Sequence, residues 1–137
     1  MRKLIYTIGI FGALSLSFCF SKPLDCKQVR NGSFYYFAKK TRERVNVYRQ
    51  DSLHIETDAQ NNEVPLKSKI VWKNDCENEM YINAYSDRIL TGDDSIIATT
   101  PANVKIIHID KSYYVCIATL NIFGKSFVVR DTLYFKD

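Results

Sequence analysis

The sequence predicts an all-β domain: an antiparallel up-and-down meander of about eight strands that closes, or nearly closes, into a barrel. Beyond residue 30, apolar residues recur with a period of two in short runs rich in Val, Ile, Tyr and Phe, which is typical of strands. No part of the chain after its N-terminal segment shows a helical period. The last runs are apolar on both faces, so both faces must lose contact with water, in a closed barrel or in a two-sheet sandwich.

The expected strands share this alternation and end at polar residues, glycine or proline. They span Ser33–Ala38, Arg44–Arg49, Leu53–Thr57, Leu66–Lys73, Cys76–Tyr85, Ala102–Ile109, Tyr113–Leu120 and Ser126–Phe135. A further short strand is expected at Ile96–Thr99. The sequence shows no repeat and no linker, so one domain is expected.

The N-terminal segment has the pattern of a secretory signal. Arg2 and Lys3 precede the uncharged, mostly apolar run Leu4–Phe20, which is short for the roughly 20 residues of a membrane-spanning helix. We therefore expect a signal peptide over residues 1–21 and a single barrel domain over residues 22–137. The protein is predicted to be exported, to the periplasm, the outer membrane or the extracellular space.

Two kinds of processing fit this segment. Leu16-Ser17-Phe18-Cys19 resembles a bacterial lipoprotein signal, in which Cys19 would carry the lipid anchor and attach the protein to a membrane. Phe18 stands where a small residue is usual, and cleavage after Ser21 is the competing interpretation.

The charge is ordinary and predicts no nucleic-acid partner. The chain carries 19 basic and 15 acidic residues, a net charge of +4. The densest basic stretch, Lys39–Arg44, is typical of a solvated loop.

Two hairpins can be interpreted down to register. With a Gln50-Asp51-Ser52 loop, Val47 lies opposite Ile55 and Tyr48 opposite His54. A two-residue loop would instead place Glu56 opposite Val47, on the apolar face, so the longer loop is expected. This choice puts His54 and Glu56 on a solvated face.

The second hairpin is predicted to turn through Lys73-Asn74-Asp75. Trp72 then lies opposite Cys76 and Ser68 opposite Met80, while Lys69 and Glu79 form a cross-strand pair on the wet face. Trp72, Cys76, Met80 and Ile82 are expected in the interior.

Three cysteines follow the signal segment: Cys26, Cys76 and Cys116. A Cys26–Cys76 disulfide is expected, closing a loop of about 50 residues and stabilising by roughly 4 kcal/mol. Cys116, in an apolar strand, is expected to be a small buried side chain; a bridge from it to either of the other two is the alternative.

A family resemblance runs from Asp25 to Tyr85. It is carried by Asp25-Cys26, Asn31-Gly32-Ser33-Phe34, Val47-Tyr48-Arg49-Gln50-Asp51-Ser52-Leu53 with Glu56, and Ile70-Val71-Trp72-Lys73-Asn74-Asp75-Cys76. These motifs resemble a family of small, uncharacterised exported bacterial proteins with a lipocalin-like meander. The resemblance implies fold and export, and no activity. Gly32-Ser33-Phe34 stands where a lipocalin would open with Gly-x-Trp.

The chain contains none of the common catalytic, phosphate-binding or dinucleotide-binding motifs. No paired Cys-x-x-Cys spacing points to a metal. We therefore expect a non-enzymatic protein with no cofactor and no metal.

Two functions remain for such a protein. In the first, the barrel binds a small apolar or amphipathic ligand through Arg49, Trp72, Met80 and Ile82. In the second, a filled barrel contacts another envelope protein through exposed tyrosines such as Tyr48, Tyr81 and Tyr85. An internal cavity above roughly 300 Å³ would favour the first function and a packed interior the second.

Overall fold

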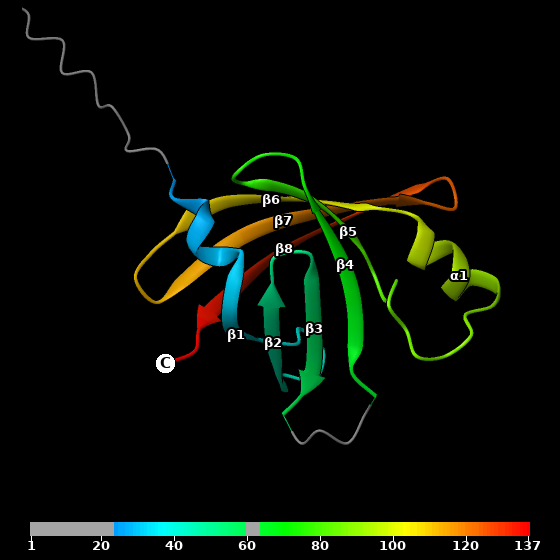
Figure 1. Ribbon diagram of the computed structural model, residues 1–137, viewed down its shortest axis with the longest axis horizontal. Helices are drawn as coiled ribbons and strands as arrows, with labels where there is room; N and C mark the ends of the chain where they lie inside the picture. The colour runs from blue at the N-terminus through cyan, green and yellow to red at the C-terminus, as the bar shows by residue number, and fades with distance from the viewer. Residues whose placement is uncertain (1–23, 60–63) are drawn as a thin grey trace, which may run out of the picture.

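The computed structural model describes residues 24–59 and 64–137. Eight antiparallel strands follow one another around a closed barrel, and β8 returns to pair with β1 (Figure 1). The predicted all-β meander is therefore confirmed, and the barrel replaces the sandwich alternative. The predicted signal peptide and Cys19 lie outside the described residues.

The strands match the expected ones closely along most of the chain. They are β1 Asn31–Phe37, β2 Arg44–Gln50, β3 Leu53–Asp58, β4 Leu66–Trp72, β5 Glu77–Tyr81, β6 Ala102–Ile109, β7 Tyr113–Ile122 and β8 Lys125–Phe135. The fifth strand is the exception, because it starts one residue later and ends four residues earlier than expected.

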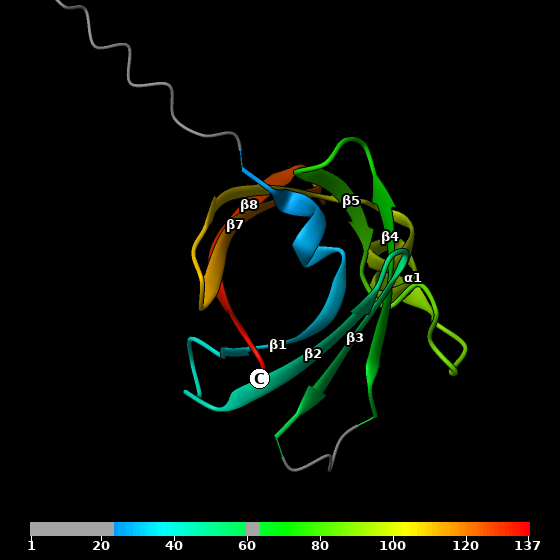
Figure 2. The same cartoon turned by 60° about the vertical axis from the view of Figure 1, so that its left-hand side comes forward.

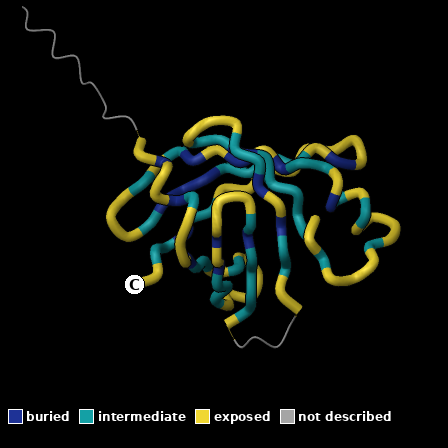
Figure 3. Tube along the Cα trace, in the orientation of Figure 1, coloured by how far each residue is buried: buried dark blue, intermediate teal, exposed yellow. Residues whose placement is uncertain are grey.

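Alternate residues of these strands point into the barrel and form its core. Phe34 from β1, Val47 from β2, Ile106 from β6 and Tyr114 from β7 are each at most 2% exposed. Phe34 packs edge-on against Tyr114, with ring centres 5.5 Å apart. The burial patterns of β2, β4 and β6 alternate, whereas β7 has three consecutive buried residues, Tyr114–Cys116. Figure 3 shows the buried parts of the chain between exposed and intermediate ones.

A 3-10 helix, η1 (Cys26–Val29), covers one end of the barrel (Figure 2). Cys26 and Val29 are fully buried in the core. The predicted disulfide is confirmed: Cys26 is bonded to Cys76, while Cys116 is free and buried. The chain segment before β1 therefore acts as a covalently attached cap, and we call this the capped end.

The opposite end carries the β1–β2, β3–β4, β5–β6 and β7–β8 connections, as the meander requires. We call it the open end. A short helix, α1 (Gly92–Thr99), lies in the β5–β6 connection, so the strand expected at Ile96–Thr99 is wrong. Asp93 and Asp94 lie in the first turn of α1, where acidic residues favour a helix N-terminus. The helix buries only Ala98, so its sequence lacks the apolar residues at helical spacing by which a helix is usually predicted. Among the described residues, no helix is long and apolar enough to cross a bilayer.

The predicted register of the β2–β3 hairpin is wrong by one residue. Val47 lies opposite Glu56 and Arg49 opposite His54, so the loop is the two-residue Asp51-Ser52. Asp51 adopts a φ of +46°, which aspartate tolerates better than most residues. The slip turns His54 and Glu56 inward, where Arg49 already lies.

The β4–β5 register is wrong by two residues, which preserves the faces. Trp72 lies opposite Asn78 and not Cys76, because Cys76 stays in the turn, where its N–H donates to Asn74 Oδ1 at 2.9 Å. Lys69 consequently lies opposite Tyr81. Glu79 pairs with Lys73 instead, at 3.0 Å between Nζ and Oε2. Trp72, Cys76 and Met80 pack against the core, as expected.

Candidate functional site

The barrel interior holds a row of polar side chains. Arg49 comes from β2, His54 and Glu56 from β3, and Tyr36 from β1. Arg49 is 6% exposed and His54 2%. Cross-strand pairing brings the first two together, since Arg49 and His54 are opposite one another.

The hydrogen bonds fix the protonation of this row. Arg49 Nη1 donates to the carbonyl of Val29 in the cap at 2.9 Å, and Arg49 Nε donates to His54 Nδ1 at 3.4 Å. Arginine has no acceptor, so Nδ1 must be the unprotonated nitrogen of His54. Its Nε2–H then donates to Glu56 Oε1 at 2.8 Å. Tyr36 OH donates to the other oxygen of Glu56 at 3.0 Å.

The electrostatics agree with this assignment. Burial lowers the pKa of His54 below 6.5, and the charge of Arg49 lowers it further against the opposing hydrogen bond to Glu56. Burial raises the pKa of Glu56, but the bonds from His54 and Tyr36 outweigh it, so this pKa lies below 4.5. At neutral pH the row therefore contains a positive Arg49, a neutral His54 and a negative Glu56.

A neutral buried histidine makes stability depend on pH. Below pH 6.5 the unfolded chain takes up a proton that folded His54 does not, so the free energy of unfolding falls as the pH falls. The loss from this group between pH 7.5 and pH 5.5 is at most about 1.4 kcal/mol, the limit for a histidine that stays neutral in the folded protein. Urea unfolding at the two pH values measures it.

The matched variants for this measurement are His54→Gln and His108→Gln. Glutamine at position 54 can still accept from Arg49 and donate to Glu56, but it does not titrate, so this part of the loss should disappear. His108→Gln, at an exposed position near the end of β6, controls for the histidine-to-glutamine change itself. An unchanged pH dependence in His54→Gln would mean that His54 takes up its proton over the same pH range in the folded protein as in the unfolded chain.

A cavity of about 90 Å³ lies beside this row. Its polar lining includes Arg49, Asn78 and Tyr114. The remaining lining residues are Tyr36, His54, Glu56, Met80, Val104, Ile106, Cys116, Ala118, Asp131 and Leu133. Among the described residues, neither Tyr114 OH nor Asn78 Oδ1 has a hydrogen-bond partner, although both atoms are buried.

Unpartnered buried polar atoms are uncommon, because each costs about 1–3 kcal/mol. Burial raises the pKa of Tyr114 to about 12, so its hydroxyl keeps its proton. Burial also raises the pKa of the Cys116 thiol to about 11, so this cysteine is unreactive at neutral pH. The cavity is therefore apolar in part. Within the described residues no group lies at hydrogen-bond distance from Tyr114 OH or Asn78 Oδ1, although the Arg49 guanidinium is close enough to Tyr114 to lower its pKa against the effect of burial.

A second hollow, of about 300 Å³, lies at the open end. Tyr36 and Glu56 line both this hollow and the cavity. The other lining residues are Glu43, Val45, Thr57, Asp58, Val64 and Leu66. The bonded Tyr36–Glu56 pair thus separates the mouth of the barrel from its interior.

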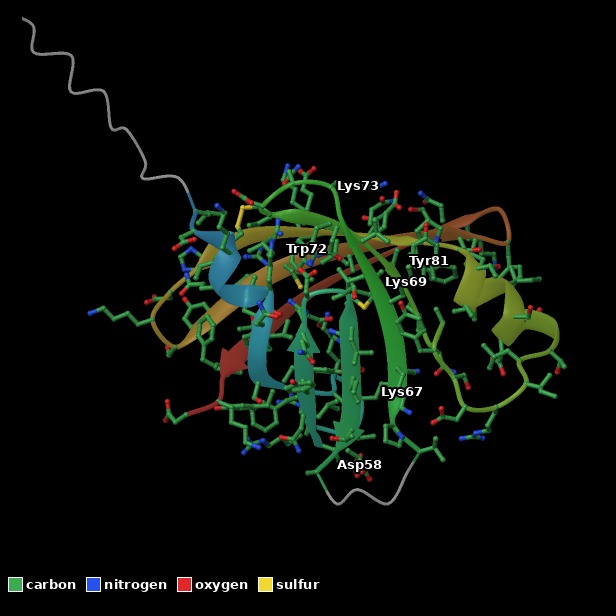
Figure 4. The ribbon with its side chains drawn as sticks, in the orientation of Figure 1. Asp58, Lys67, Lys69, Trp72, Lys73 and Tyr81 are labelled. Atoms are coloured by element: carbon green, nitrogen blue, oxygen red, sulfur yellow. A yellow bond between two sulfur atoms is a disulfide. The ribbon has the colours of Figure 1, made fainter. Side chains whose placement is uncertain are left out.

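The predicted binding residues fall in three places. Arg49 and Met80 line the cavity. Trp72 lies at the capped end (Figure 4), where its Nε1–H donates to the carbonyl of Asp51 at 3.1 Å and Arg30 stacks on its ring at 4.7 Å. Ile82 follows the last residue of β5, is partly buried, and is not among the residues that line the cavity.

Sequence reasoning missed His54, Glu56, Tyr36 and Tyr114 as site residues. The three-residue loop that the sequence predicts for the β2–β3 hairpin places His54 and Glu56 on the solvent-exposed face, whereas the observed two-residue loop turns them inward. The usable signal was Arg49, which lies two residues after Val47 and therefore on the same apolar face of the strand. A buried arginine needs an acceptor or an anion, and the two-residue loop puts Glu56 on that face.

Comparison with protein-family models, curated proteins and solved structures finds no match for this chain. The fold and the site therefore define its class by themselves. It is a closed eight-stranded barrel with one capped end, a disulfide and a polar row across its interior. The resemblance to a family of exported proteins stays a prediction.

Proposed function

We propose that the protein is an exported, non-enzymatic barrel that binds a small amphipathic ligand through its open end in the cell envelope. The observation that carries this proposal is the pair of unpartnered buried groups, Tyr114 OH and Asn78 Oδ1, in residues that line an internal cavity. A bound ligand with a polar end would supply the missing hydrogen bonds.

The dimensions limit the ligand. A cavity of about 90 Å³ is smaller than the roughly 300 Å³ at which typical ligand pockets begin. It would hold the end of a ligand, and the hollow of about 300 Å³ at the mouth would hold the rest. The hydrogen-bonded Tyr36–Glu56 pair between the two spaces would therefore have to separate when the ligand enters. Met80, Val104 and Leu133 supply apolar contacts inside, so the inserted end would be small and only partly polar.

Export is supported by two independent features. The N-terminal sequence has the signal pattern, and a Cys26–Cys76 disulfide is usual outside the reducing cytosol. The periplasm and the outer membrane remain the proposed locations, with attachment through Cys19 if that residue is acylated.

Native mass spectrometry of protein purified from its own envelope fraction tests the proposal. We expect a mass above that of the polypeptide, with the excess lost on denaturation. Ala118→Leu should reduce the retained ligand by about tenfold, because it fills the cavity. Thr119→Leu, the neighbouring residue on the outer face of β7, should retain it. A native mass equal to that of the processed polypeptide would contradict ligand binding.

The alternative function, contact with an envelope protein, draws support from an outer aromatic row. Tyr35 stacks on Tyr134 with ring centres 5.2 Å apart, and Phe37, which is 53% exposed, packs against both. Tyr48 and Tyr85 are also exposed. A native mass without ligand, together with a co-purified protein, would favour this alternative.

A further inference from the structure

We propose that the far part of β8, residues Lys125–Asp131, pairs with the same segment of a second copy of the chain. We call this segment the β8 edge. The two copies would lie antiparallel about a two-fold axis through Val128. The pairing would join two barrels into a dimer, and it is independent of ligand binding.

The β8 edge has a strand on one side only. β8 pairs with β7 along its length, from Lys125 opposite Ile122 to Tyr134 opposite Tyr113. Its pairing with β1 covers only Tyr134 and Phe135. Within the described part of the chain, Lys125–Asp131 therefore has no strand partner on its second side. Figure 1 shows the β7–β8 hairpin running beyond the barrel.

The main-chain groups on this second side belong to even-numbered residues. Lys136 N–H donates to Ser33 of β1, and the carbonyl of Arg130 accepts from Lys39 Nζ at 2.9 Å. Antiparallel strands alternate their hydrogen bonds between the two sides. Ser126 and Val128 consequently direct their N–H and C=O groups away from β7, toward the free side.

The side chains of the β8 edge are unusually apolar for an unpaired strand. Phe127 is 49% exposed, Val128 64% and Val129 40%. Proteins normally protect such an edge with proline, a bulge or inward-pointing charge, since an exposed apolar edge is a template for another strand. Here the three residues form a continuous apolar run, and the nearest charged residues are Lys125 before it and Arg130 after it.

The segment is complementary to itself in one register. Centred on Val128, antiparallel pairing places Phe127 opposite Val129 of the other copy and Lys125 opposite its Asp131. Because the axis is two-fold, each pair occurs twice. A Lys125–Asp131 ion pair therefore lies at each end of the apolar centre. Centring on Val129 would place Phe127 opposite Asp131, and centring on Phe127 would leave Lys125 opposite Val129.

Lys39 makes two contacts with the β8 edge, one with the Asp131 carboxylate and one with the Arg130 carbonyl, and neither prevents the proposed pairing. Lys39 Nζ lies 3.6 Å from Asp131 Oδ1; the Lys39 side chain is 65% exposed, and the Asp131 side chain, which also lines the cavity, is 36% exposed. Asp131 can therefore accept a second cation. Lys39 can move from the carbonyl of Arg130, because its ammonium is largely in water.

Sedimentation velocity over a range of concentrations tests the dimer. Val128→Pro should weaken it by at least about tenfold, since it removes an edge N–H and places a ring where the second strand would lie. The β7–β8 ladder should survive, because that N–H points away from β7. Val128→Thr keeps the N–H and the β-branched shape and should still dimerise. A protein that is monomeric at every concentration, or a Val128→Pro dimer of undiminished affinity, would overturn the proposal.

Cysteine cross-linking tests the register even if Val128→Pro fails to fold. Val128→Cys should form an inter-chain disulfide, because the axis brings the residue opposite itself, at about 5.5 Å between Cα atoms. Ser126→Cys and Arg130→Cys should each fail to cross-link alone but should cross-link when mixed. Equal cross-linking of all three single variants would indicate random collision and would exclude the proposed pairing.

Discussion

Replacing Arg49 with methionine is expected to lower the free energy of unfolding by about 3–5 kcal/mol, the range for breaking a buried charge network. The substitution leaves the Val29 carbonyl without its 2.9 Å donor and His54 Nδ1 without a partner. It also removes the cation that balances Glu56. Urea unfolding at pH 7.5 measures the loss.

Arg88→Met is the matched control, because Arg88 is exposed and surface substitutions usually change stability by less than about 0.5 kcal/mol. Adding Glu56→Gln to Arg49→Met should recover part of the loss, since it removes the unbalanced carboxylate. A loss below about 1 kcal/mol in Arg49→Met would show that water replaces the guanidinium inside the barrel.

Replacing both Cys26 and Cys76 with alanine is expected to destabilise the protein by about 4 kcal/mol. The bridge joins residues 50 positions apart, and a loop of that length restricts the unfolded chain strongly. Thermal or urea unfolding measures the effect, and reduction of the unaltered protein should reproduce it.

Cys116→Ala is the control for the disulfide variant, because it removes a buried sulfur without opening the cap. Its loss should be that of a small core truncation, about 1 kcal/mol. Equal losses in Cys116→Ala and the double variant would mean that packing, and not the covalent link, holds η1 in place.

Strand positions and fold could be predicted because they depend on local alternation. β6 occupies Ala102–Ile109 as expected, and β3 and β4 differ from expectation by one residue each. The faces of β4 and β5 were also correct, since a shift of two residues preserves them. Cys116 was expected as a buried thiol from its place in an apolar run, and it is one.

The polar interior could not be predicted by the same rule. Excluding a carboxylate from the inward face is sound for a single residue, but Glu56 is accompanied there by His54, Arg49 and Tyr36. In a network in which every group is hydrogen-bonded, burying a carboxylate no longer carries the cost of an unpaired charge, because each group supplies the partner that another needs. The network spans three strands, so the alternation of apolar and polar residues along a single strand does not reveal it.

The seam of the barrel, Phe34 with Phe135 and Tyr35 with Tyr134, has a consequence for how the molecule forms. Its partners are about a hundred positions apart, so this junction carries the largest loop-closure entropy of any strand pair. We infer that the ring assembles from its hairpins and that the two chain ends meet last. An incompletely synthesised chain, lacking its final residues, would be an open, curled sheet.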